Sequence, residues 1–213
     1  MELDDVLELM HLARRRYATI QACVRRRVDA RVWSEASRRR AVDLQRTFGL
    51  FEALDHIWFE SPSRYRIETE TGTRAGFVHV QNGPRSHRFD PSDAVASGTR
   101  TNVSFGDAET TYRQVMWEPN LLIPEMWLEP TGQDEVAGRN AATVRGLPRW
   151  TSHDYFMVTP ADSYELTVDL ERGVLLRLVL LYGGQVGISD EVVEATFDEP
   201  LPELLLDIPD AGE

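Results

Sequence analysis

The segment 164–182 constrains the fold more than any other part of the chain. It reads YELTVDLERGVLLRLVLLY, so the tetrapeptide Leu-Glu-Arg-Gly separates two apolar runs. As an extended strand, the second run is apolar on both faces, apart from Arg177 on one of them. The residues that alternate on the other face are Leu176, Leu178 and Leu180. A strand of this kind needs cover on both faces of its sheet.

Alternation with a period of two recurs along the chain and predicts a sheet-dominated α+β fold. Before it begins, apolar residues recur at helical spacing from Leu3 to Tyr17, which predicts a helix over 4–18. A long half-buried strand follows Thr19, and Arg26 is the exception on its apolar face. Further strands are expected at 55–60, 64–70, 75–81, 85–89, 134–138, 140–145, 163–169, 174–183 and 191–198. About ten antiparallel strands in one curved sheet, with few helices, describe residues 1–213 as a single domain.

Three connections carry further predictions. The Leu-Glu-Arg-Gly tetrapeptide fits a type I turn with Gly173 in the left-handed conformation. Residues 91–116 are rich in Ser, Thr, Gly and Asp, which indicates a long flexible connection. Residues 118–130 are apolar and bounded by prolines, which indicates a short helix.

His79 and His87 flank the turn of the hairpin expected over 75–89. A two-residue Asn82-Gly83 loop would need the N–H that Pro84 lacks. A four-residue loop places the two histidines on opposite faces, whereas a three-residue loop makes them face each other. Even then Asp90 is the one further ligand in view, so no metal site is expected.

The charge of the chain is uneven. All 23 basic residues are arginines, against 35 acids, for a net charge of −12. Residues 1–50 carry +4, residues 51–150 carry −4 and residues 151–213 carry −12. A net-acidic chain repels phosphate backbones, so no nucleic-acid partner is expected. The arginine runs at 14–16, 25–27 and 38–40 either form a surface for an acidic partner or a solvated face; the second interpretation is favoured.

Known catalytic and targeting signals do not occur in the sequence. It contains no G-x-G-x-x-G, P-loop, G-x-S-x-G or H-E-x-x-H motif, and Cys23 is its one cysteine. No cofactor and no catalytic residue is therefore predicted. The acidic start MELDDVLELM lacks the features of a signal peptide, and no apolar run approaches the roughly 20 residues of a membrane span. A cytoplasmic, non-membrane-spanning protein is expected.

Several stretches of the sequence resemble one family in order and spacing. They are WFESPSRYRIETETG, NLLIPEMWLEPTGQDEVAGRNAATVRGLPR, DSYELTVDLERGVLLRLVLLYGG and EVVEATFDEPLPELLLDIP. Together they resemble the LolA/LolB-like lipoprotein-carrier domains, the sigma-regulator sensor domain that shares their fold, and mycobacterial-type lipid-binding lipoproteins. The resemblance covers nearly the whole chain from about residue 5 and lies in the order of the pieces rather than in one sharp motif.

The resemblance implies an unclosed antiparallel β-barrel whose concave side is covered by helices and encloses a cavity for acyl chains. Its early strands would contribute Trp58, Tyr65, Ile67 and Phe77 to the cavity. The lid region over 118–130 and its approach would contribute Trp117, Leu121, Leu122, Met126 and Trp127. The later strands would contribute Leu166, Val168, Leu176, Leu178 and Leu180.

The leading hypothesis is non-enzymatic binding of a lipid or acyl chain on the concave face. The alternative is a protein–protein interaction or regulatory domain that reuses the fold, and an enzyme of unrecognised type comes third. Residue types alone do not separate an acyl-chain cavity from an ordinary core, and the ordinary core is the favoured interpretation of the apolar strands. Strand alternation also predicts that Tyr65 and Ile67 point to the concave side while Arg64, Arg66 and Glu68 point to solvent.

Overall fold

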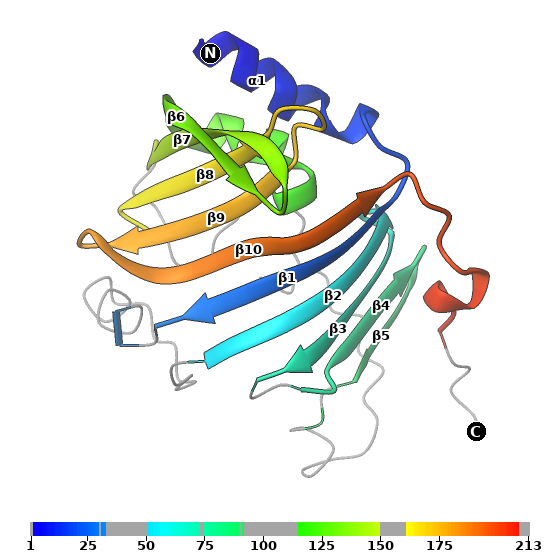
Figure 1. The fold of residues 1–213 in the computed structure, drawn as a ribbon. Helices are drawn as coiled ribbons and strands as arrows, with labels where there is room; N and C mark the ends of the chain where they lie inside the picture. Colours follow the sequence, from blue (N-terminus) through cyan, green and yellow to red (C-terminus); the bar gives the residue numbers. More distant parts are fainter. Residues whose placement is uncertain are drawn as a thin grey trace.

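The described part of the chain forms one ten-stranded antiparallel sheet (Figure 1). The computed structural model describes residues 2–29, 31–32, 51–72, 75–89, 91, 115–149 and 161–208. The strands are β1 (Ile20–Val28), β2 (Phe51–Ser61), β3 (Arg64–Thr71), β4 (Val78–Asn82), β5 (Arg85–Phe89), β6 (Met126–Val136), β7 (Arg139–Pro148), β8 (Ser163–Asp169), β9 (Leu175–Tyr182) and β10 (Gln185–Phe197). The helices are α1 (Leu3–Leu12) and the 3₁₀ turns η1 (Ala13–Arg15), η2 (Pro119–Leu121), η3 (Ile123–Glu125) and η4 (Glu203–Leu206). None of the described helices is long and apolar enough to cross a membrane.

The strand order, β5-β4-β3-β2-β1-β10-β9-β8-β7-β6, leaves β5 and β6 at opposite edges of an unclosed sheet. The first and last strands of the chain, β1 and β10, pair near its middle from Ile20 opposite Phe197 to Val28 opposite Ile188. Each neighbour in the order is antiparallel. The predicted α+β fold with an unclosed barrel is therefore confirmed. The predicted connection over 91–116 lies almost wholly outside the described residues.

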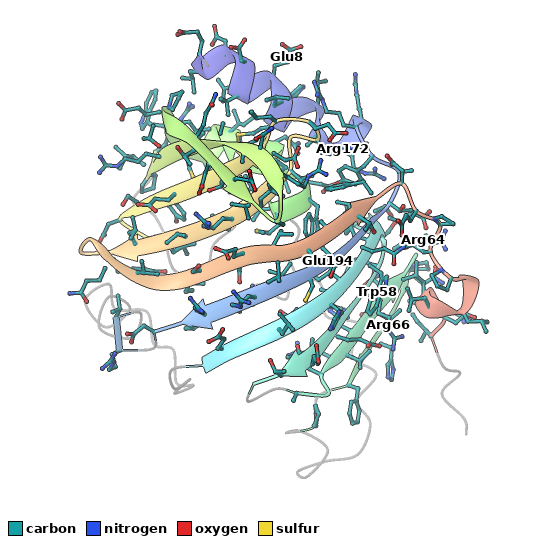
Figure 2. All side chains as sticks on the ribbon, in the orientation of Figure 1. Glu8, Trp58, Arg64, Arg66, Arg172 and Glu194 are labelled. Atoms are coloured by element: carbon teal, nitrogen blue, oxygen red, sulfur yellow. The ribbon has the colours of Figure 1, made fainter. Side chains whose placement is uncertain are left out.

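The two faces of the sheet differ in what covers them. The inner face bears Ile20 of β1 and its cross-strand neighbours Phe59 and Phe197. The ring of Tyr17 packs on both phenylalanines, with centroids 6.4 and 6.2 Å away, so the segment after η1 covers this face. The outer face bears Trp58 and Arg66, which lie with Glu194 on the side that Figure 2 turns to the viewer.

Helix α1 is fixed against the turn between β8 and β9. Val6, Met10 and Ala13 are fully buried along one stripe of the helix and its continuation, as the helical spacing predicts. Gly173 has a φ of +76°, so the predicted left-handed glycine is confirmed. A Cβ on Gly173 would lie 2.1 Å from the carbonyl oxygen of Leu9, so both the backbone conformation and the passing helix require glycine here.

Two segments cover parts of the outer face. The tip of the β6–β7 hairpin crosses β8 and β9 (Figure 1), and Arg177 of β9 donates to both Asp134 of β6 and Glu191 of β10. Val179, on this outer side of β9, is buried, so the predicted cover on both faces is confirmed. The second segment is η4, whose Leu206 is buried with Val80 of β4 on the outer side of β3 and β4.

The η4 segment changes one prediction about β3. Tyr65 and Ile67 point to the inner face as expected, and Arg64 is exposed. Arg66 lies on the outer face but does not point freely to solvent. Its side chain donates to the carbonyl oxygen of Leu205 at 3.2 Å and to Glu68. The sequence prediction missed this because it did not foresee that the C-terminal segment returns to β3.

The β4–β5 hairpin has a two-residue Gly83-Pro84 turn, so the three- and four-residue loops considered above are wrong. Gly83 has the positive φ, +59°, that a type II′ turn requires at its first central position. Pro84 fits the second position because the closing bond uses the N–H of Arg85. The resulting register places His79 opposite Arg88 and His87 opposite Val80, so the two histidines lie on opposite faces.

Candidate functional site

Most of the predicted cavity residues lie together on the inner face or in its cover. On β8 and β9, the side chains of Leu166, Val168, Leu176, Leu178 and Leu180 are fully buried. Tyr65, Ile67 and Phe77 are buried on or beside β3 and β4. Residues 115–126, called the covering segment below, include Trp117, Leu122 and Met126, which are buried. Leu121 is half-buried beside them. All of these residues except Phe77 belong to one continuous apolar cluster.

Trp58 and Trp127 do not belong to this set. Trp58 pairs with Gln21 and Arg66 on the outer face, because Ile57 and Phe59 on either side of it point inward. Trp127 is 63% exposed, with the guanidinium of Arg149 4.3 Å from its ring centre. The predicted helix within 118–130 ends with η3 at Glu125, and strand alternation from there turns Met126 inward and Trp127 outward.

Tyr17 attaches the covering segment to the rest of the fold. Its hydroxyl donates to the carbonyl oxygen of Trp117 at 2.8 Å, across 100 positions of sequence. Burial raises the pKa of Tyr17 well above its ordinary value, against the opposing effect of the nearby Arg14 guanidinium. The neutral phenol is therefore the form that the folded protein retains.

The inner face also buries polar groups, which the cavity prediction did not include. Arg26 of β1 donates to both carboxylate oxygens of Asp190 on β10, at 2.7 and 2.9 Å, and both residues are buried. Next to this pair, Thr69 of β3 donates to Asp55 of β2 at 2.6 Å. The signal for the ion pair was present in the sequence, since Arg26 interrupts an otherwise apolar strand face. The identity of its partner was not.

His79 occupies the inner face of β4 close to these groups. Its Nε2 lies 3.1 Å from the hydroxyl of Ser86, and its ring meets that of Tyr65 edge-on at 5.3 Å. Over the described ranges, no three His, Cys, Asp or Glu side chains are grouped as metal ligands. The histidine therefore acts as a packed, hydrogen-bonded member of the inner face.

Cys23 and His56 are cross-strand neighbours on the outer face. Burial, followed by the nearby carboxylate of Glu70, raises the pKa of the Cys23 thiol, which disfavours the nucleophilic thiolate. His56 is hydrogen-bonded to Glu70 at 2.8 Å. An activated cysteine has its pKa lowered by a nearby positive charge, whereas burial and the Glu70 carboxylate raise the pKa of Cys23.

Comparison with known proteins gives structural matches alone. No protein-family model matches the chain, and no curated protein matches it in sequence. In the MucA/MucB complex of Pseudomonas aeruginosa, one chain is 17% identical, with a TM-score of 0.60 over 96% of this chain and 60% of that chain. A crystal structure of MucB gives 18% identity and a TM-score of 0.59 over 97% of this chain and 62% of that chain.

An uncharacterized conserved protein from Thermus thermophilus matches over nearly all of both chains. It is 15% identical, with a TM-score of 0.58 over 99% of this chain and 96% of that chain. This chain thus spans about the full length of the Thermus protein but only 60% of the MucB chain in the complex. At such identities the likeness establishes the fold alone. The chain therefore shares its fold, an unclosed antiparallel barrel, with MucB.

Proposed function

We propose that the protein binds a hydrophobic ligand with an acyl chain on its inner face, without covalent chemistry. The observation that carries the proposal is the continuous apolar surface of β8 and β9, whose large side chains are fully buried beneath a separate covering segment. An acyl chain would replace part of the packing between Leu166, Leu178 and Leu180 on the sheet and Trp117 and Leu122 in the covering segment.

The energetics of such binding are favourable for a chain of moderate length. Each buried methylene contributes about 0.8 kcal/mol, so a handful of methylenes offsets much of the cost of association. The polar contacts of the covering segment include the Tyr17–Trp117 hydrogen bond and the Arg14–Glu118 ion pair, neither of which is part of the strand pairing. The sheet itself supplies a rigid wall.

Native mass spectrometry of freshly expressed protein tests the proposal. We expect an adduct of lipid mass that survives gentle desolvation and exchanges with an added fatty-acid ester. The same measurement on Trp58→Phe, an outer-face variant, should show the same adduct. A bare protein mass that stays unchanged after incubation with fatty-acid esters and phospholipids would contradict the proposal.

A second candidate function, binding of a protein partner, is favoured by the open edge of β6. Trp127 and its cross-strand neighbour Leu147 are exposed there. Among the described residues, β7 is the one strand that pairs with β6, so the other backbone edge of β6 is open. The carboxylates of Glu125 and Glu129 have no ion-pair partner within the described ranges. MucB, which shares the fold, forms a complex with MucA. An extended basic segment that adds a strand to β6 fits this edge.

The arginine runs give no comparable support for a partner. Arg14 and Arg16 donate to the backbone carbonyls of Glu60 and Glu171. Arg25 and Arg27 lie 3.5 and 3.4 Å from Glu52, and Arg26 is buried against Asp190. Five of the six arginines in these two runs thus contact the fold itself, in keeping with the favoured interpretation. The run at 38–40 lies outside the described residues.

A peptide titration tests the second candidate. In antiparallel pairing, a partner would place a basic residue opposite Glu129, an aliphatic residue opposite Leu128 and an aromatic residue opposite Trp127. We expect a labelled eight-residue peptide with the core Arg-Val-Phe to bind in fluorescence anisotropy and Glu129→Lys to abolish that binding. The matched control is Glu194→Lys, which makes the same charge change on β10. If both variants lost peptide binding equally, the loss would come from the change in net charge, and a site at the β6 edge would be contradicted.

A further inference from the structure

The indole N–H of Trp117 is a buried hydrogen-bond donor with no acceptor. Trp117 is 1% exposed, and its Nε1 atom is inaccessible to solvent and has no hydrogen-bond partner. Buried tryptophans ordinarily satisfy this group, because an unpaired buried donor forfeits the hydrogen bond that water gave it. An orphan of this kind calls for an explanation.

The orphan donor is located within the proposed ligand site. Tyr17 holds the main chain of Trp117, and the Tyr17 ring packs on Phe59 and Phe197 of the inner face. The indole belongs to the same apolar cluster as Leu166 and Leu178. The donor therefore lies where an acyl chain would replace part of that packing.

In the described part of the chain, the one other buried atom without a hydrogen bond is the Nε of Arg172, and it lies 3.3 Å from a carboxylate oxygen of Glu171. That guanidinium uses NH1 to reach the carboxylate of Asp198 at 2.7 Å, and it lies near the ring of Phe197. Its charge is already paired at the rim of the fold. Trp117 has no such compensation, so it is the orphan that points to a ligand.

We propose that the Trp117 indole donates a hydrogen bond to the carbonyl oxygen of an acyl ester, which makes the ligand a lipid ester rather than a plain hydrocarbon. The inference rests on the proposed function and names its ligand class. A neutral ester carbonyl accepts a hydrogen bond without bringing charge into the apolar cluster. A carboxylate would have to bury its charge there, which costs far more.

Equilibrium dialysis against radiolabelled methyl laurate, lauric acid and dodecane tests this assignment. We expect the wild-type protein to bind the ester about tenfold more tightly than the alkane, the value of one good hydrogen bond. Trp117→Phe keeps an aromatic ring but removes the donor. It should bind ester and alkane within about twofold of each other. Trp58→Phe on the outer face should keep the wild-type preference.

Each result of this experiment has one meaning. Alkane and ester bound equally by the wild type, or an ester preference retained in Trp117→Phe, overturns the role of Trp117 and leaves the proposed function standing. Binding of none of the three ligands overturns both. Tighter binding of lauric acid than of the ester replaces the ester with a free fatty acid and overturns the ester assignment.

A stability measurement on the unliganded protein separates a ligand donor from a structural one. Because the donor has no partner in the fold, Trp117→Phe should lose only the stability that the smaller ring costs in packing at a buried site. A loss well beyond that, together with an unchanged ester preference, would show that the donor serves an internal acceptor, and would overturn the proposal.

Discussion

On β8 and β9 the inner face consists almost entirely of leucine, valine and tyrosine side chains, whereas on β10, β1 and β2 the same face buries an arginine and two aspartates. Leu178 and Asp190 illustrate the difference, because they are directly opposite each other on β9 and β10 and both are buried. The apolar region is stabilised by the apolar area that it buries and by close packing, which many combinations of apolar residues provide. The polar region depends on particular pairs, since a buried charge that has lost its partner strongly destabilises the folded state.

The largest expected effect comes from breaking the ion pair. Asp190→Ala removes the bidentate acceptor of Arg26 and leaves the guanidinium buried without that carboxylate. We expect a loss of about 4 kcal/mol in the free energy of unfolding, measured by urea denaturation. The double variant Arg26→Met with Asp190→Leu should recover most of that loss. If the single variant costs no more than an exposed salt bridge does, about 1 kcal/mol or less, the two regions do not differ in this way.

A truncation in the apolar region should cost somewhat less. Leu178→Ala leaves a void at a fully buried site, and we expect a loss of about 3 kcal/mol. The distinguishing measurement is a second substitution, Leu178→Met, which conserves volume and should cost less than about 1.5 kcal/mol. A Met variant as damaging as the Ala variant would show that this region, too, depends on particular partners.

The outer face of β3 provides a smaller test of specific contacts. Arg66 donates to Leu205 and Glu68 and is partly exposed, so Arg66→Ala should cost about 1 kcal/mol. Arg64→Ala is the matched control on the same strand, because Arg64 forms an exposed ion pair with Glu60 of β2, and it should stay within about 0.5 kcal/mol. Thermal unfolding of the two variants side by side measures the contribution of the η4 contact. Identical midpoints would mean that η4 adds no stability to β3.

At neutral pH the effect of Tyr17→Phe should be no larger than that of Arg66→Ala, about 1 kcal/mol, since it loses one buried hydrogen bond to Trp117. Its pH dependence is more informative. The pKa of Tyr17 is raised in the folded state, so the contribution of the neutral phenol is fully present below the unfolded pKa of about 10 and declines as pH rises above it. The difference in urea midpoint between the wild type and Tyr17→Phe should therefore shrink or reverse between about pH 9 and 11. A constant difference would contradict the burial of this phenol.

Strand alternation in the sequence predicted which face several residues of the candidate site occupy, but it failed wherever a residue's neighbours in space were decisive. Leu176, Leu178 and Leu180 could be placed because they alternate within one strand. Trp127 was assigned to the wrong face because the start of β6 could not be located from the apolar run around it. The His79–His87 geometry depended on the Gly83-Pro84 turn, whose type II′ conformation was not among the loops considered.

Spacing within single segments of chain was enough to predict the antiparallel strands, the amphipathic helix, the left-handed Gly173 and the place of Arg26 on the apolar face of its strand. Three contacts became visible only in the folded chain: Asp190 neutralises Arg26, η4 returns to cover Val80, and Tyr17 holds Trp117. The hydrogen bond from Arg26 to Asp190 joins residues 164 positions apart. The bond from Arg66 to Leu205 of η4 spans 139 positions, and the bond from Tyr17 to Trp117 spans 100. No local pattern encodes such distances, because strand order and register are set by how all the strands pack together.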